Sequence, residues 1–211
     1  TSPAANFAAG EVVFHHDDPA DTMHLISRGR FAVRVRTSVG DTAILTVLGP
    51  GEIFGEVALL GPEQRRTATV ESLEAGETRS LLRGDLEALR RTHPGVSDVL
   101  IAILVGEVKR LSGHLLEALY VPSDKRVLRR LVELAAVYGT EEAAEVTIPL
   151  RQEDLAGLAG TSRATVNRVL REEEAKGTVR LSRGKVTVVD AEALRRRGHS
   201  PGSSGSSPRE R

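Results

Sequence analysis

The sequence predicts an α+β protein in which a β-sandwich or barrel comes first, one long helix follows, and a helix-turn-helix with a β-hairpin ends the fold. Three observations predict it. Short apolar or alternating runs recur at roughly 8–12-residue spacing through residues 10–83, as in a sandwich or barrel. One helical apolar stripe then runs from residue 96 to about residue 119. Two helical segments flank Gly160, and a hairpin pattern follows at residues 179–189.

Composition limits the classes of protein to which the chain can belong. Its 211 residues suit one or two domains, and the 40% of hydrophobic residues can form a core. The absence of cysteine excludes disulfides, iron–sulfur clusters and a thiol nucleophile. The longest apolar run, 99–105, is far shorter than the ~20 residues that cross a bilayer. We therefore expect a cytoplasmic protein without membrane contact, and, because residue 1 is not Met, a natural N-terminus upstream of Thr1.

The sequence of residues 10–83 predicts β-structure. Strands are expected over residues 12–14, 23–26, 31–35, 44–48, 67–73 and 78–82, because turn residues separate these runs. The run Phe-Ala-Val-Arg-Val-Arg that starts at Phe31 alternates cleanly. We therefore expect one buried face there, with Arg34 and Arg36 directed outward.

After Arg83 the spacing of the apolar residues becomes that of a helix. A short helix is expected at residues 85–91, and a long one follows. The apolar stripe of the long helix contains Leu100, Leu104, Val108, Leu111 and Leu115. A second copy of the chain is the simplest partner for such a stripe, which would give a two-fold homodimer. The alternative is that the helix packs only on its own β-domain.

Four parts are expected along the chain. They are a β-domain at 1–92, the long helix and hinge at 93–121, a helix-turn-helix domain at 122–197, and a disordered Ser/Gly/Pro-rich tail at 198–211. The net charge is zero but is distributed unevenly. Residues 1–118 carry 12 basic and 16 acidic side chains, whereas residues 148–197 carry 11 and 7. This asymmetry is typical of a protein whose C-terminal part contacts a polyanion.

Residues 152–170 have the pattern of a helix-turn-helix. Gly160 can adopt the left-handed turn between the helices, and Ser162 can cap the second helix. Leu155 and Val166, together with Leu170 or Val169, would fill the core. The first turns of the second helix would then reach base edges in the major groove of DNA. The alternative is an ordinary helical hairpin with solvated arginines.

The exposed side chains of this region suit DNA contacts. Arginine pairs well with guanine and asparagine with adenine, and a basic hairpin tip suits phosphates. The candidate DNA-binding residues are Arg151, Gln152, Ser162, Arg163, Ala164, Thr165, Asn167, Arg168 and Lys185, with Arg183 beside the last.

A second dense motif lies at residues 51–70. Gly55 allows a tight backbone, and residues 56–60 can form a helical turn whose free N–H groups favour an anion. Arg66 can pair with a phosphate, Thr67 can donate to it, and Glu56 can accept from a sugar hydroxyl. The alternative is a surface loop with a Glu–Arg ion pair.

The two motifs, in this order and joined by a long helix, resemble the family of the cyclic-AMP receptor protein and FNR over most of the chain. The resemblance implies a cyclic-nucleotide-binding β-roll (a jelly roll), a dimerisation helix and a winged helix-turn-helix. It implies that Glu56 holds the ribose 2′-hydroxyl, while Arg66, Thr67 and the backbone around Gly55, Val57 and Ala58 hold the cyclic phosphate. The expected partners are double-stranded DNA, a second copy, an effector such as cyclic AMP, and RNA polymerase, with no covalent cofactor.

The sequence departs from the family pattern at two places. The adjacent Thr-Ser pair that contacts adenine in the cyclic-AMP binder falls on His114-Leu115, so His114 is the candidate base contact. In the recognition helix the acidic residue that accepts from cytosine is replaced by Ala164. We therefore expect an operator that overlaps the usual half-site without copying it.

The remaining patterns favour neither a metal site nor an enzyme. The six histidines lack metal-ligand spacing, so we interpret them as surface or packing residues rather than ligands of a metal or haem. No nucleophile–base pair or catalytic carboxylate pair is recognisable. Two rival interpretations stay open: a ligand-independent DNA binder of the same fold, and a cyclic-nucleotide-binding module that acts through protein partners.

Overall fold

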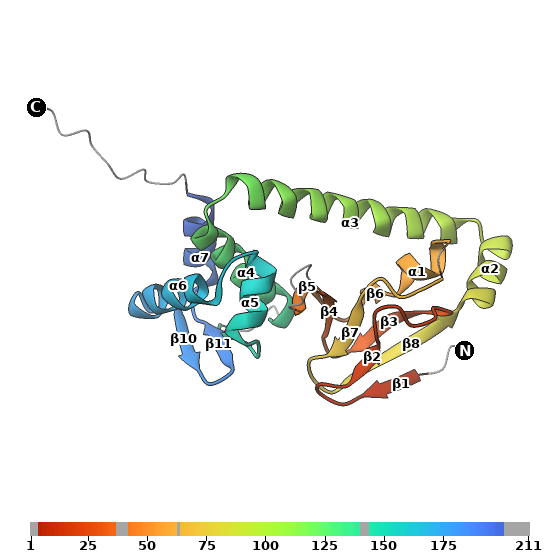
Figure 1. The fold of residues 1–211 in the computed structure, drawn as a ribbon, viewed down its shortest axis with the longest axis horizontal. Coiled ribbons are helices and arrows are strands. Elements are labelled where there is room, and N and C mark those ends of the chain that lie inside the picture. The colour runs from red at the N-terminus through yellow and green to blue at the C-terminus, as the bar shows by residue number, and fades with distance from the viewer. Residues whose placement is uncertain (1–3, 37–41, 63, 140–143, 201–211) are drawn as a thin grey trace, which may run out of the picture.

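The computed structural model describes residues 4–36, 42–62, 64–139 and 144–200. A β-domain occupies one end of the molecule and a mainly helical domain the other, and one long helix runs along both (Figure 1). Within the described residues, no helix is long and apolar enough to cross a membrane.

The β-domain is a roll of two antiparallel four-stranded sheets, ordered β1-β8-β3-β6 and β2-β7-β4-β5. The strands of the first sheet are β1 (Ala4–Phe7), β8 (Gly76–Leu82), β3 (Thr22–Arg28) and β6 (Ile53–Phe54). Those of the second are β2 (Val12–Phe14), β7 (Thr69–Ser72), β4 (Phe31–Arg36) and β5 (Thr42–Leu48). Ile26, Phe31, Phe54 and Val70 form a buried cluster in the roll. The six predicted strands are present, whereas β1 and the two-residue β6 were not predicted.

Three helices follow the roll or interrupt it. They are α1 (Glu56–Leu60), α2 (Arg83–Thr92) and α3 (Gly95–Tyr120). Leu100 of α3 is buried against Met23, Leu59 and Leu86, so the N-terminal half of α3 packs on its own roll. The other face of α3 is apolar and exposed.

This exposed α3 stripe consists of Ile101, Val105, Val108, Leu115 and Leu119. With Ser112 these positions are spaced alternately by four and three residues, which is the spacing of a coiled-coil seam. The predicted stripe is therefore partly wrong. Leu100 is turned inward and Leu104 is half-buried, whereas Val108 and Leu115 are exposed as expected. Leu111 is exposed too, but it lines the cavity between α3 and the roll.

The C-terminal domain is built around a helix-turn-helix. Its elements are α4 (Ser123–Tyr138), β9 (Val146–Ile148), α5 (Gln152–Ala159), α6 (Arg163–Ala175), β10 (Val179–Ser182), β11 (Lys185–Val188) and α7 (Ala191–His199). The strands form one sheet in the order β10-β11-β9. The predicted hairpin is confirmed, whereas β9 and α7 were not predicted. The predicted tail began too early, because Gly198 lies in α7 and packs near Arg129; residues 201–211 lie outside the described residues.

One prediction about β4 is wrong. Ala32 is fully buried and Arg34 is mostly buried, because helix α5 covers the face that was expected to meet solvent. Only Arg36 is exposed. The roll and the C-terminal domain thus share one continuous apolar cluster, in which Ile44 and Val47 of β5 join Leu155 and Ala156 of α5.

Candidate functional site

A cavity of about 630 Å³ lies between the roll, α1 and α3. We call it the roll cavity. Its lining includes residues from β4 and β5, the segment from Gly51 to Ala58, the segment from Arg66 to Ala68, and Ile103, Gly106, Glu107, Arg110 and Leu111 of α3. Its size falls within the roughly 300–1,000 Å³ of small-molecule sites.

Gly55 shapes the entrance to α1. Its φ of +84° lies in the left-handed region that favours glycine. A Cβ atom there would lie 2.7 Å from Nη1 of Arg66 and 3.1 Å from the carbonyl oxygen of Thr22. Glycine is therefore required both by the turn and by the close approach of Arg66.

Arg66 is a buried cation at this cavity. Its Nη1 donates to the carbonyl of Thr22 (2.6 Å) and its Nη2 to the hydroxyl of Thr22 (2.7 Å). The guanidinium lies 3.9 Å from the ring centroid of Phe14, and Nε has no hydrogen-bond partner among the described residues. Burial lowers the pKa of Arg66. A buried arginine with an unused donor is well suited to bind an anion.

The cavity also offers acceptors. Burial raises the pKa of Glu56, and the negative charge of Glu107 adds to this effect. Glu107 accepts two hydrogen bonds from Arg110, one of them 2.8 Å from Nε. The lining can thus donate to a phosphate and accept from hydroxyl or amine groups, which fits a nucleotide.

The structure brings most of the predicted ligand residues together. Gly55, Glu56, Val57, Ala58, Arg66 and Thr67 all line the roll cavity. Glu107 and Arg110 were not predicted, although their position on the long helix facing the roll could have indicated them. His114 does not line the cavity, because it lies about one turn further along α3.

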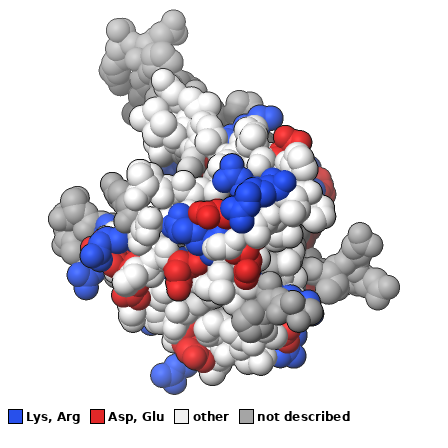
Figure 2. Space-filling view, turned by 90° about the vertical axis from the view of Figure 1, so that its right-hand side faces the viewer, with Lys and Arg blue, Asp and Glu red and all other residues white. Residues whose placement is uncertain are grey.

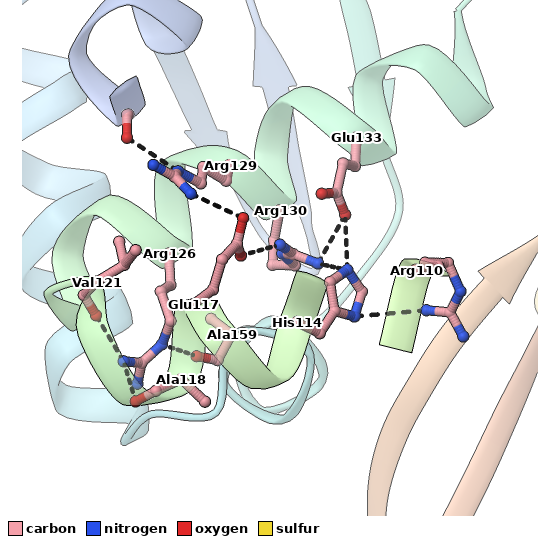
Figure 3. A network of polar contacts seen from close by, with 11 residues as sticks. Arg110, His114, Glu117, Ala118, Val121, Arg126, Arg129, Arg130, Glu133 and Ala159 are labelled. Atoms are coloured by element: carbon pink, nitrogen blue, oxygen red, sulfur yellow. Dashed lines mark hydrogen bonds and ion pairs between the residues drawn. The ribbon is translucent and has the colours of Figure 1, made fainter. Parts of the chain in front are cut away.

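His114 instead joins α3 to α4 in a polar network (Figure 3). Its Nε2 accepts from Arg130, and its Nδ1 lies 3.5 Å from Nη1 of Arg110. Glu133 pairs with Arg130 at 2.9 Å. Burial lowers the pKa of His114, and the charges of Arg130 and Arg110 lower it further.

Arg126 extends the contacts between these elements (Figure 3). It donates to the carbonyl oxygen of Val121 at the end of α3 (2.8 Å) and to that of Ala159 at the end of α5 (2.8 Å). The end of the long helix is therefore tied directly to the turn of the helix-turn-helix.

The second candidate site is a groove of about 460 Å³ between α6 and the β10–β11 hairpin, which we call the wing groove. Gly160 adopts the predicted left-handed turn, with φ +57° and ψ +46°. Ser162 caps α6 by accepting from the backbone N–H of Thr165 (3.2 Å). Both predictions about the turn are confirmed.

The wing groove gathers basic and amide side chains. Among the predicted residues, Arg151, Gln152, Arg163, Asn167, Arg183 and Lys185 line it, and Arg171 was not predicted. Ala164 and Arg168 are exposed on α6 outside this lining, and Arg168 pairs with Glu172 at 2.7 Å. The opposite end of the molecule differs, because basic and acidic side chains are interspersed there (Figure 2).

Comparison with known proteins identifies the family. The cyclic nucleotide-binding domain matches residues 4–93, and the Crp-like helix-turn-helix domain matches residues 125–197. The CRP-like cAMP-activated global transcriptional regulator of Mycobacterium tuberculosis is 31% identical over 194 residues, which are 91% of this chain and 86% of that protein. This chain belongs to the CRP/FNR family. The cyclic AMP receptor protein of Thermus thermophilus is 32% identical over 89% of this chain and 84% of its own length.

Solved structures agree on the CRP/FNR fold. FixK2 of Bradyrhizobium japonicum has a TM-score of 0.81 at 19% identity and covers 96% of this chain and all of its own. A CRP/FNR regulator of Thermus thermophilus has a TM-score of 0.79 at 23% identity, over 95% of this chain and all of its own. The family consists of transcription regulators. This chain is accordingly a DNA-binding regulator with a cyclic nucleotide-binding domain.

Proposed function

We propose that this CRP/FNR regulator is a homodimer whose affinity for DNA is set by a cyclic nucleotide in the roll cavity. The observation that carries the proposal is the cavity itself, which combines a buried arginine, a hydroxyl and a carboxylate with a wall formed by α3. Arg66 and Thr67 would bind the cyclic phosphate, and Glu56 would accept from the ribose hydroxyl. Cyclic AMP is the first candidate, because it activates the regulator in M. tuberculosis.

The base of the bound nucleotide would contact α3. Glu107, Arg110 and Leu111 line that wall, so we propose these residues, rather than His114, as the base contacts. A carboxylate next to a guanidinium offers both acceptors and donors, and the identity of the base depends on which of them it uses.

The exposed α3 stripe would form the dimer. Its seam spacing and its exposure support a second copy of α3 as its partner. Two recognition helices would then read half-sites about one helical turn of DNA apart, ~34 Å. Arg163, Asn167 and Arg168 would contact bases, while Arg151, Arg183 and Lys185 would contact phosphates. We propose a cytoplasmic location for this activity and no catalytic function.

One observation favours a second candidate function. Both Nη atoms of Arg66 already donate hydrogen bonds to Thr22. Most of the hydrogen-bonding capacity of this arginine is therefore used without a ligand. The second candidate is therefore a DNA binder that is independent of a ligand.

Calorimetry of the purified dimer with cyclic AMP and with cyclic GMP separates the two candidates. Saturable binding of either nucleotide supports effector control. Heats of dilution only, together with unimpaired binding to duplex DNA, would establish the ligand-independent candidate.

A further inference from the structure

Strands β4 and β5 form a wall whose two faces contact different parts of the molecule. Val33, Val35 and Leu45 line the roll cavity. Ala32 and Ile44 instead belong to the apolar cluster that the roll shares with α5. The same two strands therefore contact the cavity on one face and the helix-turn-helix on the other.

Helix α5 lies directly on the backbone of β5. A Cβ atom added to Gly157 would lie 3.2 Å from the backbone nitrogen of Ile44 and 3.3 Å from the Cβ of Ala43. Glycine at this position lets the helix approach so closely. A displacement of β5 would therefore be transmitted to α5 without an intervening layer of side chains.

Arg34 stabilises the contact between the roll and α5. Its Nε donates to Glu71 of the roll (2.7 Å), and its Nη1 donates to Asp154 of α5 (2.9 Å). The side chains of Arg34 and Asp154 are only 11% and 9% exposed. Separation of the two surfaces would break this buried ion pair and leave Arg34 with Glu71 and Asp154 with the exposed Arg151, 3.5 Å away, as their remaining ion-pair partners. The pair therefore disfavours separation of the two surfaces.

A second arginine supports the same arrangement. Arg30 precedes β4, pairs with Glu74 of the roll (2.7 Å), and donates through Nε to the carbonyl of Val137 near the end of α4 (3.0 Å). Its guanidinium also lies 4.5 Å from the ring centroid of Tyr138. Two roll arginines thus hold the C-terminal domain at points that do not involve α3.

We propose that Arg34 is a positioning residue for DNA binding. Through Asp154 it holds α5, and with α5 the recognition helix α6, in one orientation against the β4–β5 wall. A ligand in the roll cavity then acts on the DNA-binding domain through this wall as well as through α3. The statement about the ligand rests on the proposed function, whereas the positioning role does not.

The docked orientation is compatible with DNA binding. Among the described residues, the lining of the wing groove contains none from the roll. Arg163, Asn167 and Arg168 are exposed in this arrangement. Because a dimer must present two recognition helices at a fixed spacing, an immobilised α5 increases the fraction of molecules that can bind both half-sites.

The test compares Arg34→Met with Arg36→Met. Both changes remove one positive charge from β4, but Arg36 is exposed and has no ion-pair partner among the described residues. DNA affinity is measured by fluorescence anisotropy on a duplex selected with the wild type. If the competent fraction falls to about a tenth, Arg34→Met weakens binding roughly tenfold. Arg36→Met retains wild-type affinity. Arg34→Lys, which keeps the charge but has one nitrogen where Arg34 uses two, binds with intermediate affinity.

Two further variants separate positioning from simple stability. Asp154→Asn alone weakens DNA binding. Its combination with Arg34→Met is no worse than Asp154→Asn alone, because both changes remove the Arg34–Asp154 pair, while only Asp154→Asn also alters the 3.5 Å pair with Arg151. Gly157→Leu raises the helix propensity of α5 yet clashes with β5, so it also weakens DNA binding. Thermal unfolding and light scattering check that each variant is a folded dimer.

The proposal is overturned if folded Arg34→Met binds the duplex as tightly as the wild type or more tightly. Additive losses in the Arg34→Met, Asp154→Asn double variant also overturn it. A wild type that binds no cyclic nucleotide contradicts the proposed effector function but not the role of Arg34. That role is still tested by comparing the DNA affinities of the wild type and Arg34→Met without ligand. If cyclic AMP binds, its effect on DNA affinity shrinks in Arg34→Met while its own affinity stays unchanged.

Discussion

Arg66 is the residue on which ligand binding in the roll cavity depends most in the proposed function. We predict that Arg66→Ala abolishes measurable cyclic-nucleotide binding, because a charge-assisted contact is typically worth ~1.5–3 kcal/mol, or roughly 10- to 150-fold in affinity. Calorimetry measures the change. Arg65→Ala is the matched control, since Arg65 is exposed and bonds only to the backbone of Asp17 among the described residues. Equal affinities of a folded Arg66→Ala and the wild type would contradict the assignment.

We expect His24 to make the roll sensitive to acid. It is buried, stacks on Phe54 at 4.9 Å between ring centroids, and lies 3.2 Å from the hydroxyl of Thr78. Burial, aided by the charge of Arg66, lowers the pKa of His24 to about 4. In the unfolded chain the value is ~6.5. Between these two values the unfolded state binds a proton that the folded state excludes, so acid favours unfolding.

The free energy of unfolding should therefore fall as the pH is lowered from 6.5 towards 4, by up to about 3 kcal/mol. Urea unfolding at a series of pH values measures this slope. In His24→Gln the slope should be smaller, because the titrating group is gone. An identical slope in the variant and the wild type would mean that other groups cause the acid sensitivity.

The residues of α6 and those of the β10–β11 hairpin should contact different parts of the DNA, the bases and the phosphates respectively. Arg168→Ala should flatten one position of a selected binding motif, because loss of an Arg–guanine contact costs ~1–3 kcal/mol at one base pair. Lys185→Ala should leave the motif unchanged and lower the salt slope by about one, as expected for a phosphate contact. Ala164→Glu should add a preference for cytosine. Binding-site selection tests all three, and a motif unchanged by Arg168→Ala would make that arginine a phosphate contact.

Candidate residues were predictable where their function depends on local sequence. Gly55, Gly160 and Ser162 act within turns and caps, so their spacing already indicates their positions. His114 and Arg34 were misplaced, because their surroundings come from α4 and α5, which lie far along the chain.

At the scale of elements, α3 carries the clearest expectation. We predict that Val108→Glu with Leu115→Glu yields monomers, because both side chains are exposed on the α3 stripe and burial of each is worth ~1.5–3 kcal/mol per chain. Sedimentation measures the mass. Ala102→Glu, at an exposed position of α3 that is not part of the stripe, is the control and should stay dimeric. A monomeric wild type would reject the α3 seam.

The elements with long, periodic patterns were predicted, and several of the short ones were not. α3 is 26 residues long, and its pattern gave its limits to within one residue. Strand β6 has two residues and β9 three, which is too short for a recognisable period. The predicted orientation of α3 was less accurate, because its apolar residues serve two surfaces, the roll through Leu100 and the exposed stripe through Val108.

At the scale of the whole molecule, the order of the two domains follows from the sequence, and their contact does not. The charge asymmetry indicated which end meets DNA. The contact depends on Gly157 lying against β5 and on Arg34 reaching Asp154, 120 residues further along the chain. A pattern of alternation within β4 contains no information about such a distant partner. Contact with RNA polymerase stays a prediction.

The central claim is that a nucleotide in the roll cavity controls DNA binding by α6. The most direct measurement is the affinity for one selected duplex, by fluorescence anisotropy, of the wild type and of Arg66→Ala, each with and without saturating cyclic AMP. We predict that cyclic AMP tightens binding by the wild type and leaves Arg66→Ala unaffected, while the two proteins bind equally without it. An affinity of the wild type that does not change with cyclic AMP, or an equal response in both proteins, would contradict the claim.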